Sequence, residues 1–235
     1  MQKKDDDAML AKERILYEDN HIIVVNKLPS EIVQGDRTGD ETLMEAVRRY
    51  IKKKYDKPGN VFLGAPHRLD RPTSGIVVFA RTGKALSRLG TMFREREVRK
   101  IYWAVVDGMP PEPEGRLVSH LIRNREKNKS FAVSGNRKQA KRAELSYRLL
   151  GATANYYMLE IELHTGRHHQ IRAQLAAVGV HIKGDLKYGA ARSNRGGGIH
   201  LHARKIIFSH PVGGQKLEIT APTPEDPLWN QFSSI

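Results

Sequence analysis

One nine-residue segment, 67–75, gathers most of the residue types in this sequence that could do chemistry. It reads His-Arg-Leu-Asp-Arg-Pro-Thr-Ser-Gly and holds one carboxylate, Asp70, between two arginines, Arg68 and Arg71. Because a nearby cation favours the charged form of a carboxyl group, we expect Asp70 to be ionised near neutral pH. A salt-bridged turn would use the same residue types, so these residues alone leave a structural and a catalytic role open.

The order of the nine residues resembles the HRLDRxTSG signature of the RluA-like pseudouridine synthases, with Pro72 in the variable place. The resemblance implies that Asp70 is the catalytic residue that isomerises a uridine within RNA. It leaves open whether Asp70 acts as a nucleophile or as a base that removes a proton from the ribose. We expect no cofactor and no metal, because nothing is oxidised and no group is imported.

A second segment, 164–172, carries three histidines and two arginines. Its part Thr-Gly-Arg-His-His-Gln-Ile-Arg is similar to the second signature of the same family, with His168 in place of a threonine. Nearby, Gln174 stands where family members often have histidine. The resemblance implies that Arg172 anchors the Asp70 carboxylate as a bidentate partner. His164 and His168 have no carboxylate between them, so we expect no metal site here.

The resemblance extends to Lys-Ile-Tyr-Trp-Ala at residues 100–104, which fits a Lys-x-Tyr-x-Ala pattern of the family. It implies that Tyr102 lines the active site and packs against the target base. A stacked uridine must be flipped out to reach the aspartate, at a cost of a few kcal/mol for unstacking. The resemblance implies that Arg68 fills the space left behind, and we expect Arg71 and Arg167 to contact RNA as well.

The strongly basic composition favours binding to a polyanionic partner. The formal net charge is +14 and the pI is about 10.0, which favours nucleic acid or an anionic membrane surface. There are no cysteines, which excludes disulfides and Cys-based metal sites. We find neither a secretory signal nor the roughly 20 apolar residues of a membrane helix. We therefore expect a cytoplasmic monomer that acts on structured RNA, either ribosomal or transfer RNA.

Three other classes of protein fit part of this sequence. A glycoside hydrolase usually needs two carboxylates at a fixed separation, and the central segment offers one. A membrane-surface protein would need a basic amphipathic helix with bulky apolar anchors, which only residues 40–55 approach. A non-catalytic RNA-binding protein would explain the charge equally well, but a carboxylate in a cationic pocket would repel phosphate. It remains the main alternative to an isomerase.

Hydrophobic periodicity predicts the elements that must position these residues. We expect a strand on each side of the central segment, at 61–63 and 76–80. Helices are predicted at 40–55, with Asp40 as the N-cap, at 83–97 and at 168–178, with Ile171, Leu175 and Val178 inward. The remaining expected elements are strands at 15–17, 21–25, 98–106, 143–150 and 156–163, and hairpins within 116–133 and 201–221.

These elements and the resemblance together imply an α+β chain with the pseudouridine synthase catalytic fold. That fold is a mixed, mostly antiparallel sheet in two halves, with flanking helices and a central cleft. We expect one catalytic domain at 14–224, a charged tail at 1–13, a C-terminal tail at 225–235 and no separate N-terminal RNA-binding module. The segment 107–115 is rich in proline and glycine, and we expect it to mark the waist between the halves.

Overall fold

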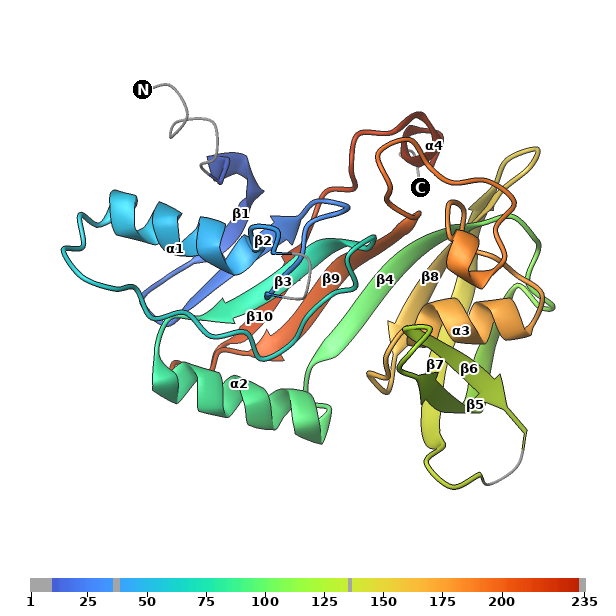
Figure 1. Ribbon diagram of the computed structural model, residues 1–235, viewed down its shortest axis with the longest axis horizontal. Coiled ribbons are helices and arrows are strands. Elements are labelled where there is room, and N and C mark those ends of the chain that lie inside the picture. The colour runs from blue at the N-terminus through green and yellow to red at the C-terminus, as the bar shows by residue number, and fades with distance from the viewer. Residues whose placement is uncertain (1–9, 36–38, 135–136, 233–235) are drawn as a thin grey trace. The chain divides into compact units, whose positions relative to one another are not determined.

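The structure is a computed structural model that describes residues 10–35, 39–134 and 137–232 (Figure 1). The first of its two compact units comprises the chain up to Val98 and residues 206–222. The second comprises residues 99–205 and the chain from Thr223 onward. The chain passes from one unit to the other after Val98, Lys205 and Pro222. The waist predicted at 107–115 is therefore wrong, because that segment lies inside the second unit.

The first unit is built on a sheet in which β1, β2 and β3 pair in antiparallel fashion. Strands β1, β2 and β3 pair in that order, β9 follows β3, and β10 pairs with β9. The elements are η1 (Lys12–Arg14), β1 (Ile15–Glu18), β2 (Ile22–Lys27), α1 (Leu43–Lys54), β3 (Ser74–Ala80), α2 (Gly83–Glu95), β10 (Lys216–Thr220) and the end of β9 (Leu201–Ser209).

Helix α2 covers one face of this sheet. Its Ala85 and Leu89 share a buried cluster with Val24 of β2 and Val78 of β3. Every residue of β3 is buried, as its unbroken apolar sequence predicts for a strand covered on both faces. The segment that holds Asp70 therefore runs directly into a rigid strand.

The start of helix α1 differs from the prediction. The N-cap is Thr42 and not Asp40. The Glu45 backbone N–H donates to Thr42 Oγ1 at 3.1 Å, and the Thr42 backbone N–H donates to the Glu45 carboxylate at 2.8 Å. This reciprocal capping box satisfies two donors at the helix start. Asp40 instead forms an ion pair with Arg71 at 2.7 Å.

The strand predicted at 61–63 is absent. These residues have no regular secondary structure, and Phe62 is 51% exposed. Gly64 alone pairs with Ala80 through two backbone hydrogen bonds of 2.9 and 2.8 Å. The central segment is thus held by a strand only on its C-terminal side, because one bridge takes the place of the expected entry strand.

The second unit contains the longer run of paired strands. The order is β9, β4, β8, β7, β5 and β6, with antiparallel registers from β4 through β6. The elements are β4 (Arg99–Val106), β5 (Glu114–Asn124), β6 (Lys129–Val133), β7 (Lys141–Ala152), β8 (Tyr157–Leu163), α3 (Gln170–Ala177), η2 (Leu186–Tyr188), the start of β9 and α4 (Pro227–Asn230). The hairpin predicted within 116–133 is confirmed.

Both faces of this second sheet are covered. On one face, Ile171 and Leu175 of α3 pack against strand residues such as Leu159. On the other face, Trp229 and Phe232 pack against Val105 and Met158. The described part of the expected C-terminal tail therefore belongs to the core of this unit. Val178, predicted to point inward, is 38% exposed because α3 ends at Ala177.

The predicted α+β class is confirmed, with antiparallel strand pairs and helices on the sheet faces. In the described ranges, no helix is both long and apolar enough to cross a bilayer. Residues 1–9, which make up most of the predicted N-terminal tail, lie outside the described residues. Within the rest of that tail, Leu10 is buried.

Candidate functional site

Asp70 lies on a tight turn in the first unit. The Thr73 backbone N–H donates to the Asp70 carbonyl oxygen at 3.0 Å, which closes the turn, and β3 begins at Ser74. Gly75 has a φ of 109°, a backbone conformation that residues other than glycine rarely adopt. Asp70 itself is half-buried. The turn therefore fixes the position of a carboxylate that is neither sealed in the core nor fully solvated.

Lys27 anchors this turn through its backbone carbonyl oxygens. Its Nζ donates to the carbonyl oxygens of Leu28, Arg71 and Thr73, at 2.9, 3.0 and 2.6 Å. The side chain is completely buried. Burial lowers the pKa of Lys27 to about 7, and the carboxylates of Glu31 and Asp70 partly oppose this shift. A single ammonium thus holds the backbone on both sides of Pro72.

Sequence reasoning missed Lys27. The sequence signal was a lysine that follows the apolar run 22–25 after one residue, Asn26, but we predicted no site role for it. Lysine is almost never fully buried unless it has partners. Its carbonyl partners are 44 and 46 residues away in the chain, so only the folded structure identifies them.

His67 fixes the other end of the segment. Its Nε2 accepts a hydrogen bond from the Val78 backbone N–H at 2.9 Å, and its ring stacks on Phe93 with centroids 4.5 Å apart. The two arginines that flank Asp70 are both exposed. Arg71 pairs with Asp40, an exposed interaction worth at most about 1 kcal/mol. Phosphate could therefore compete for Arg71 at little cost.

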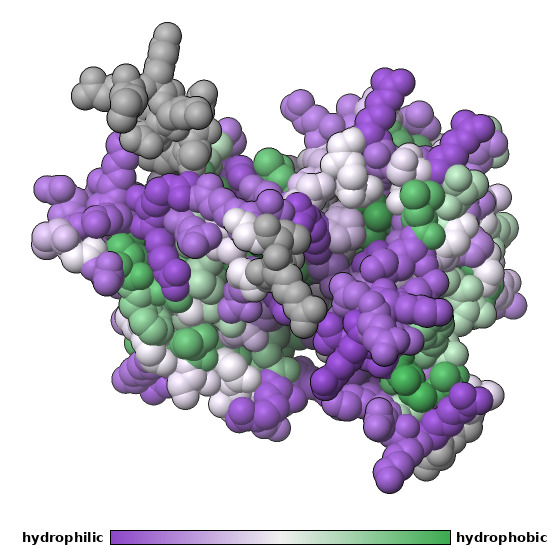
Figure 2. Space-filling view, viewed as in Figure 1, coloured by the Kyte–Doolittle hydropathy of each residue, from purple (hydrophilic) through white to green (hydrophobic). Residues whose placement is uncertain are grey.

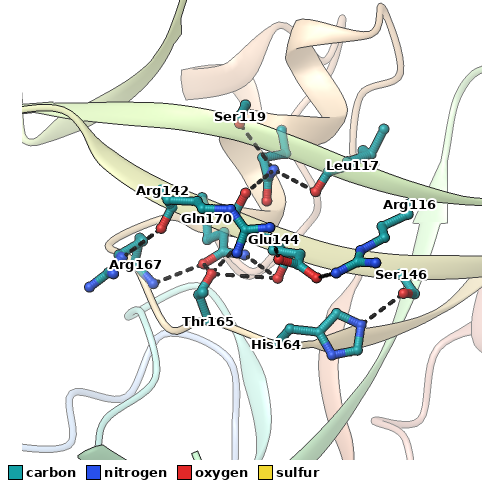
Figure 3. Close-up of polar contacts among 12 residues, drawn as sticks. Arg116, Leu117, Ser119, Arg142, Glu144, Ser146, His164, Thr165, Arg167 and Gln170 are labelled. Carbon is teal, nitrogen blue, oxygen red and sulfur yellow. Dashed lines mark hydrogen bonds and ion pairs between the residues drawn. The ribbon is translucent and has the colours of Figure 1, made fainter. Parts of the chain in front are cut away.

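The second signature lies in the second unit and is built into its core (Figure 3). Thr165 Oγ1 accepts from the Glu144 backbone N–H at 2.9 Å and donates to Gln170 Oε1 at 2.7 Å. The Gln170 side chain also accepts from the Arg167 backbone N–H and donates to the Glu144 carbonyl oxygen, both at 3.0 Å. These contacts close the loop that leads into α3.

One further signature residue, Arg167, and the nearby Gln174 contact the neighbouring strands. Arg167, predicted to contact RNA, donates from Nε to the Arg142 carbonyl oxygen at 3.0 Å and is half-buried. Gln174, the departure from the family pattern, donates to the carbonyl oxygens of Leu117 and Ala143 at 3.1 and 3.3 Å. It therefore ties α3 to β5 and β7.

Arg172 has a buried carboxylate partner that sequence reasoning did not identify. Its Nε and one terminal nitrogen donate to the two oxygens of Asp185, at 2.6 and 2.8 Å. Both side chains are buried, and the Arg172 guanidinium carbon lies 4.9 Å from the centre of the Tyr188 ring. Asp185 lies in the segment Gly-Asp-Leu-Lys-Tyr-Gly at residues 184–189, for which we predicted no role. The predicted pairing of Arg172 with Asp70, which belongs to the other unit, stays a prediction.

Tyr102 is half-buried on β4, opposite Ile161 of β8. It packs against the cluster that contains Ile171 and Leu175 of α3. Tyr102 and α3 therefore lie on the same face of the sheet in the second unit. The predicted roles of Tyr102 and Arg172 in one active site require this arrangement, because α3 carries Arg172.

His169 is a second residue that sequence reasoning left without a role. Burial, and then the nearby Arg172 charge, lower its pKa to about 2, so the ring is neutral in the folded protein. Its Nδ1 lies 2.9 Å from the Tyr188 hydroxyl. Among the residues that the structure describes, no three His, Asp or Glu side chains are arranged to hold a metal ion.

Comparison with known proteins adds an independent observation. Residues 21–177 match the family model described as RNA pseudouridylate synthase. The ribosomal large subunit pseudouridine synthase D of Zymomonas mobilis is 31% identical over 223 residues, covering 90% of this chain and 69% of the relative. The ribosomal large subunit pseudouridine synthase C of Vibrio cholerae is 34% identical over 214 residues, covering 88% and 65%.

Comparison of structures agrees. Human RNA pseudouridylate synthase domain containing 4 superposes with a TM-score of 0.75 at 24% identity, covering 90% of this chain and 88% of that one. At this identity the likeness establishes the fold, which confirms the predicted pseudouridine synthase fold. The family match, the relatives and the fold agree with one another: the chain belongs to the RNA pseudouridylate synthase family, whose members are isomerases that act on RNA.

Proposed function

We propose that this chain converts uridine to pseudouridine at specific positions of a structured RNA, with Asp70 as the catalytic residue. We propose residues 14–224 as the catalytic domain, together with residues 225–232, which pack on its second unit. The observation that carries the proposal is the geometry of the Asp70 turn. Its backbone is held by a buried ammonium and by the rigid strand β3, while the carboxylate remains half-buried. A reactive carboxylate needs this combination of fixed position and access to substrate.

The reaction breaks the N1–C1′ bond of the uridine and joins C5 to C1′. The hydrogen on C5 leaves as a proton and N1 gains one, so the isomerisation needs no oxidant and imports no group. Asp70 acts on the ribose, either as a nucleophile at C1′ or as a base. Arg172 stabilises its charge, and Tyr102 packs on the uracil. The exposed Arg68 takes the place of the flipped nucleotide in the RNA.

Ribosomal RNA of the large subunit is the substrate that we propose, because the named relatives from Zymomonas mobilis and Vibrio cholerae are ribosomal large subunit synthases. The cytoplasm is then the expected compartment. The net charge of +14 supports phosphate contacts. Affinity for RNA should therefore fall steeply as salt concentration rises.

The experiment measures tritium release from RNA that carries 5-³H-uridine and lacks pseudouridine. We expect Asp70→Asn and Asp70→Ala to lower the rate by about 10²–10⁴-fold and to retain RNA binding. Asp56→Asn is the matched control, because Asp56 is an exposed aspartate of the same unit whose φ of 45° suits asparagine. Wild-type protein that releases no tritium from any such RNA would contradict the proposal, and so would an active Asp70→Asn variant.

A further inference from the structure

The β5–β6 hairpin of the second unit carries a dense group of cations at its turn. Arg123, Arg125, Lys127 and Lys129 fall within seven residues, with Glu126 as the one acidic residue among them. Three of these cations, at 123, 125 and 127, are exposed. Figure 2 shows hydrophilic surface in the region of this hairpin beside a hydrophobic patch, and Val118 and Phe131 of its strands are exposed apolar residues. Clustered cations of this kind contact phosphates and position a protein on RNA without reading its sequence.

His168 joins this hairpin to the start of α3 through both nitrogens of its ring. Nε2 lies 3.1 Å from Asn128 Oδ1, and Nδ1 lies 2.9 Å from Ser130 Oγ. An amide oxygen can only accept, so Nε2 donates to Asn128, and Nδ1 forms the second contact with the Ser130 hydroxyl. Figure 1 shows β6 beside α3. One side chain therefore reaches both the turn and the first residues of β6.

Neighbouring contacts hold the same strand by its backbone. The Tyr188 hydroxyl accepts from the Ser130 N–H at 2.8 Å and donates to the Ser130 carbonyl oxygen at 3.2 Å. His169, whose ring stacks on His168 with centroids 3.8 Å apart, places its Nδ1 2.9 Å from that hydroxyl. Tyr188 thus fixes the start of β6, whereas His168 extends the connection to Asn128 in the turn. Asn128 Oδ1 also accepts from Arg123 at 3.3 Å, which links the cation to the bridge.

We propose that His168 is a positioning residue for RNA binding, which holds the basic turn of the β5–β6 hairpin in place relative to Arg172. The inference rests on the proposed function, because the position of these cations matters only when RNA is bound. Threonine, the residue of the family signature, is too short to reach both Asn128 and Ser130. His168 acts through the hairpin and takes no part in bond making or breaking.

The first test separates binding from turnover. The probe is unmodified large-subunit ribosomal RNA made by transcription in vitro, and binding is measured in an Asp70→Asn background so that no reaction occurs. We expect His168→Thr to raise the dissociation constant and KM about fivefold to tenfold, because two hydrogen bonds are lost. We expect kcat to change by less than about twofold. His168→Gln, which keeps an amide donor, should recover part of the affinity.

A double-mutant cycle distinguishes positioning from a general loss of stability. Substituting Arg125→Gln and Lys127→Gln together should weaken binding in the wild type and have a smaller effect in His168→Thr. Lys216→Gln removes one exposed charge from the first unit and should add independently to either background. Additive effects of His168 and the turn would overturn the proposal, as would a fall in kcat at constant KM.

The two proposals fail in different ways. If the wild type turns over none of the RNA but the coupling between His168 and the turn is present in binding, the proposed function fails and the positioning role stands. If tritium is released at full rate and His168→Thr binds as tightly as the wild type, the positioning role fails and the proposed function stands.

Discussion

The two signature segments are held in place by opposite means. Around Asp70 the contacts go to the backbone: Lys27 binds carbonyl oxygens on the turn, and Ser30 donates its N–H to the Arg71 carbonyl oxygen at 2.9 Å. In the segment 165–172 the contacts are made by the side chains themselves, among them Thr165, Gln170 and Arg172. The Asp70 segment is positioned by contacts that other residues make with its backbone. The segment 165–172 is positioned by its own side chains, which are part of the core.

This difference bears on how each segment tolerates change. A turn held by its carbonyl oxygens leaves the side chains of Asp70 and Arg71 available to a substrate, because the contacts that hold the turn are made to its backbone. A segment held by buried side chains loses stability when they are altered, since each buried polar group must keep a partner. Substitutions near Asp70 should therefore affect turnover before stability, and substitutions in 165–172 should affect both.

The largest effect on stability should come from the buried pair in the second unit. Asp185→Asn leaves the Arg172 guanidinium buried without its charged partner, and we expect a loss of about 3–5 kcal/mol in the free energy of unfolding. Urea denaturation followed by tryptophan fluorescence measures it, because both tryptophans, Trp103 and Trp229, belong to this unit.

The matched control is an exposed pair in the same unit. Arg99 binds both oxygens of Glu162, at 2.6 and 2.8 Å, but its side chain is 56% exposed. Glu162→Gln should therefore cost at most about 1 kcal/mol. Equal losses for Asp185→Asn and Glu162→Gln would show that burial of Arg172 and Asp185 is not what makes that pair important.

An intermediate effect is expected for Lys27→Met in the first unit. The carbonyl oxygens of Arg71 and Thr73 lose their donor, so the Asp70 turn loses its anchor and kcat should fall about 10- to 100-fold. Lys84→Met, at an exposed lysine of the same unit, is the control and should leave kcat unchanged. A Lys27→Met variant with normal turnover would refute the anchoring role.

Lys27 also makes the stability of the first unit depend on pH above neutrality. Its pKa is about 7 in the folded protein and 10.5 in the unfolded chain, so between these values the unfolded chain binds the extra proton. Stability therefore rises with pH in this window, by at most about 1.4 kcal/mol per pH unit relative to Lys27→Met. Hydrogen exchange of the amides in β2 and β3 from pH 7 to 10 would detect the rise, and parallel profiles for both proteins would exclude it.

The smallest effect is an acid-sensitive contribution in the second unit. The folded protein keeps His169 neutral down to a pKa of about 2, whereas the unfolded value is 6.5. Stability from this residue is thus complete above pH 6.5 and falls as the pH drops, by at most about 1.4 kcal/mol per pH unit. His169→Asn, which suits the φ of 54°, should flatten the fluorescence-monitored profile between pH 6.5 and 4.5. An unchanged slope would show that His169 does not contribute.

Local patterns in the sequence predicted most of the elements. Alternating and continuous apolar runs gave β3, α2 and the β7–β8 hairpin, because burial imposes those periods on the chain. Two predicted features differ in the structure, the N-cap of α1 and the strand at 61–63. A Thr-x-x-Glu box at Thr42 displaced the cap predicted at Asp40. Residues 61–63 are apolar but have no regular secondary structure, and Gly64 after them forms a single bridge to Ala80.

The sequence by itself determined the family and predicted the chemistry, through the RluA-like signatures around Asp70 and Arg172 and a charge of +14 that favours RNA. Tertiary structure alone decided which groups hold that chemistry in place. The contacts of Lys27 with the Asp70 turn, of Asp185 with Arg172 and of His168 with Asn128 join residues 13 to 46 positions apart. Periodicity reports which side of an element is buried, but a partner for a buried polar group is selected only when distant segments pack together.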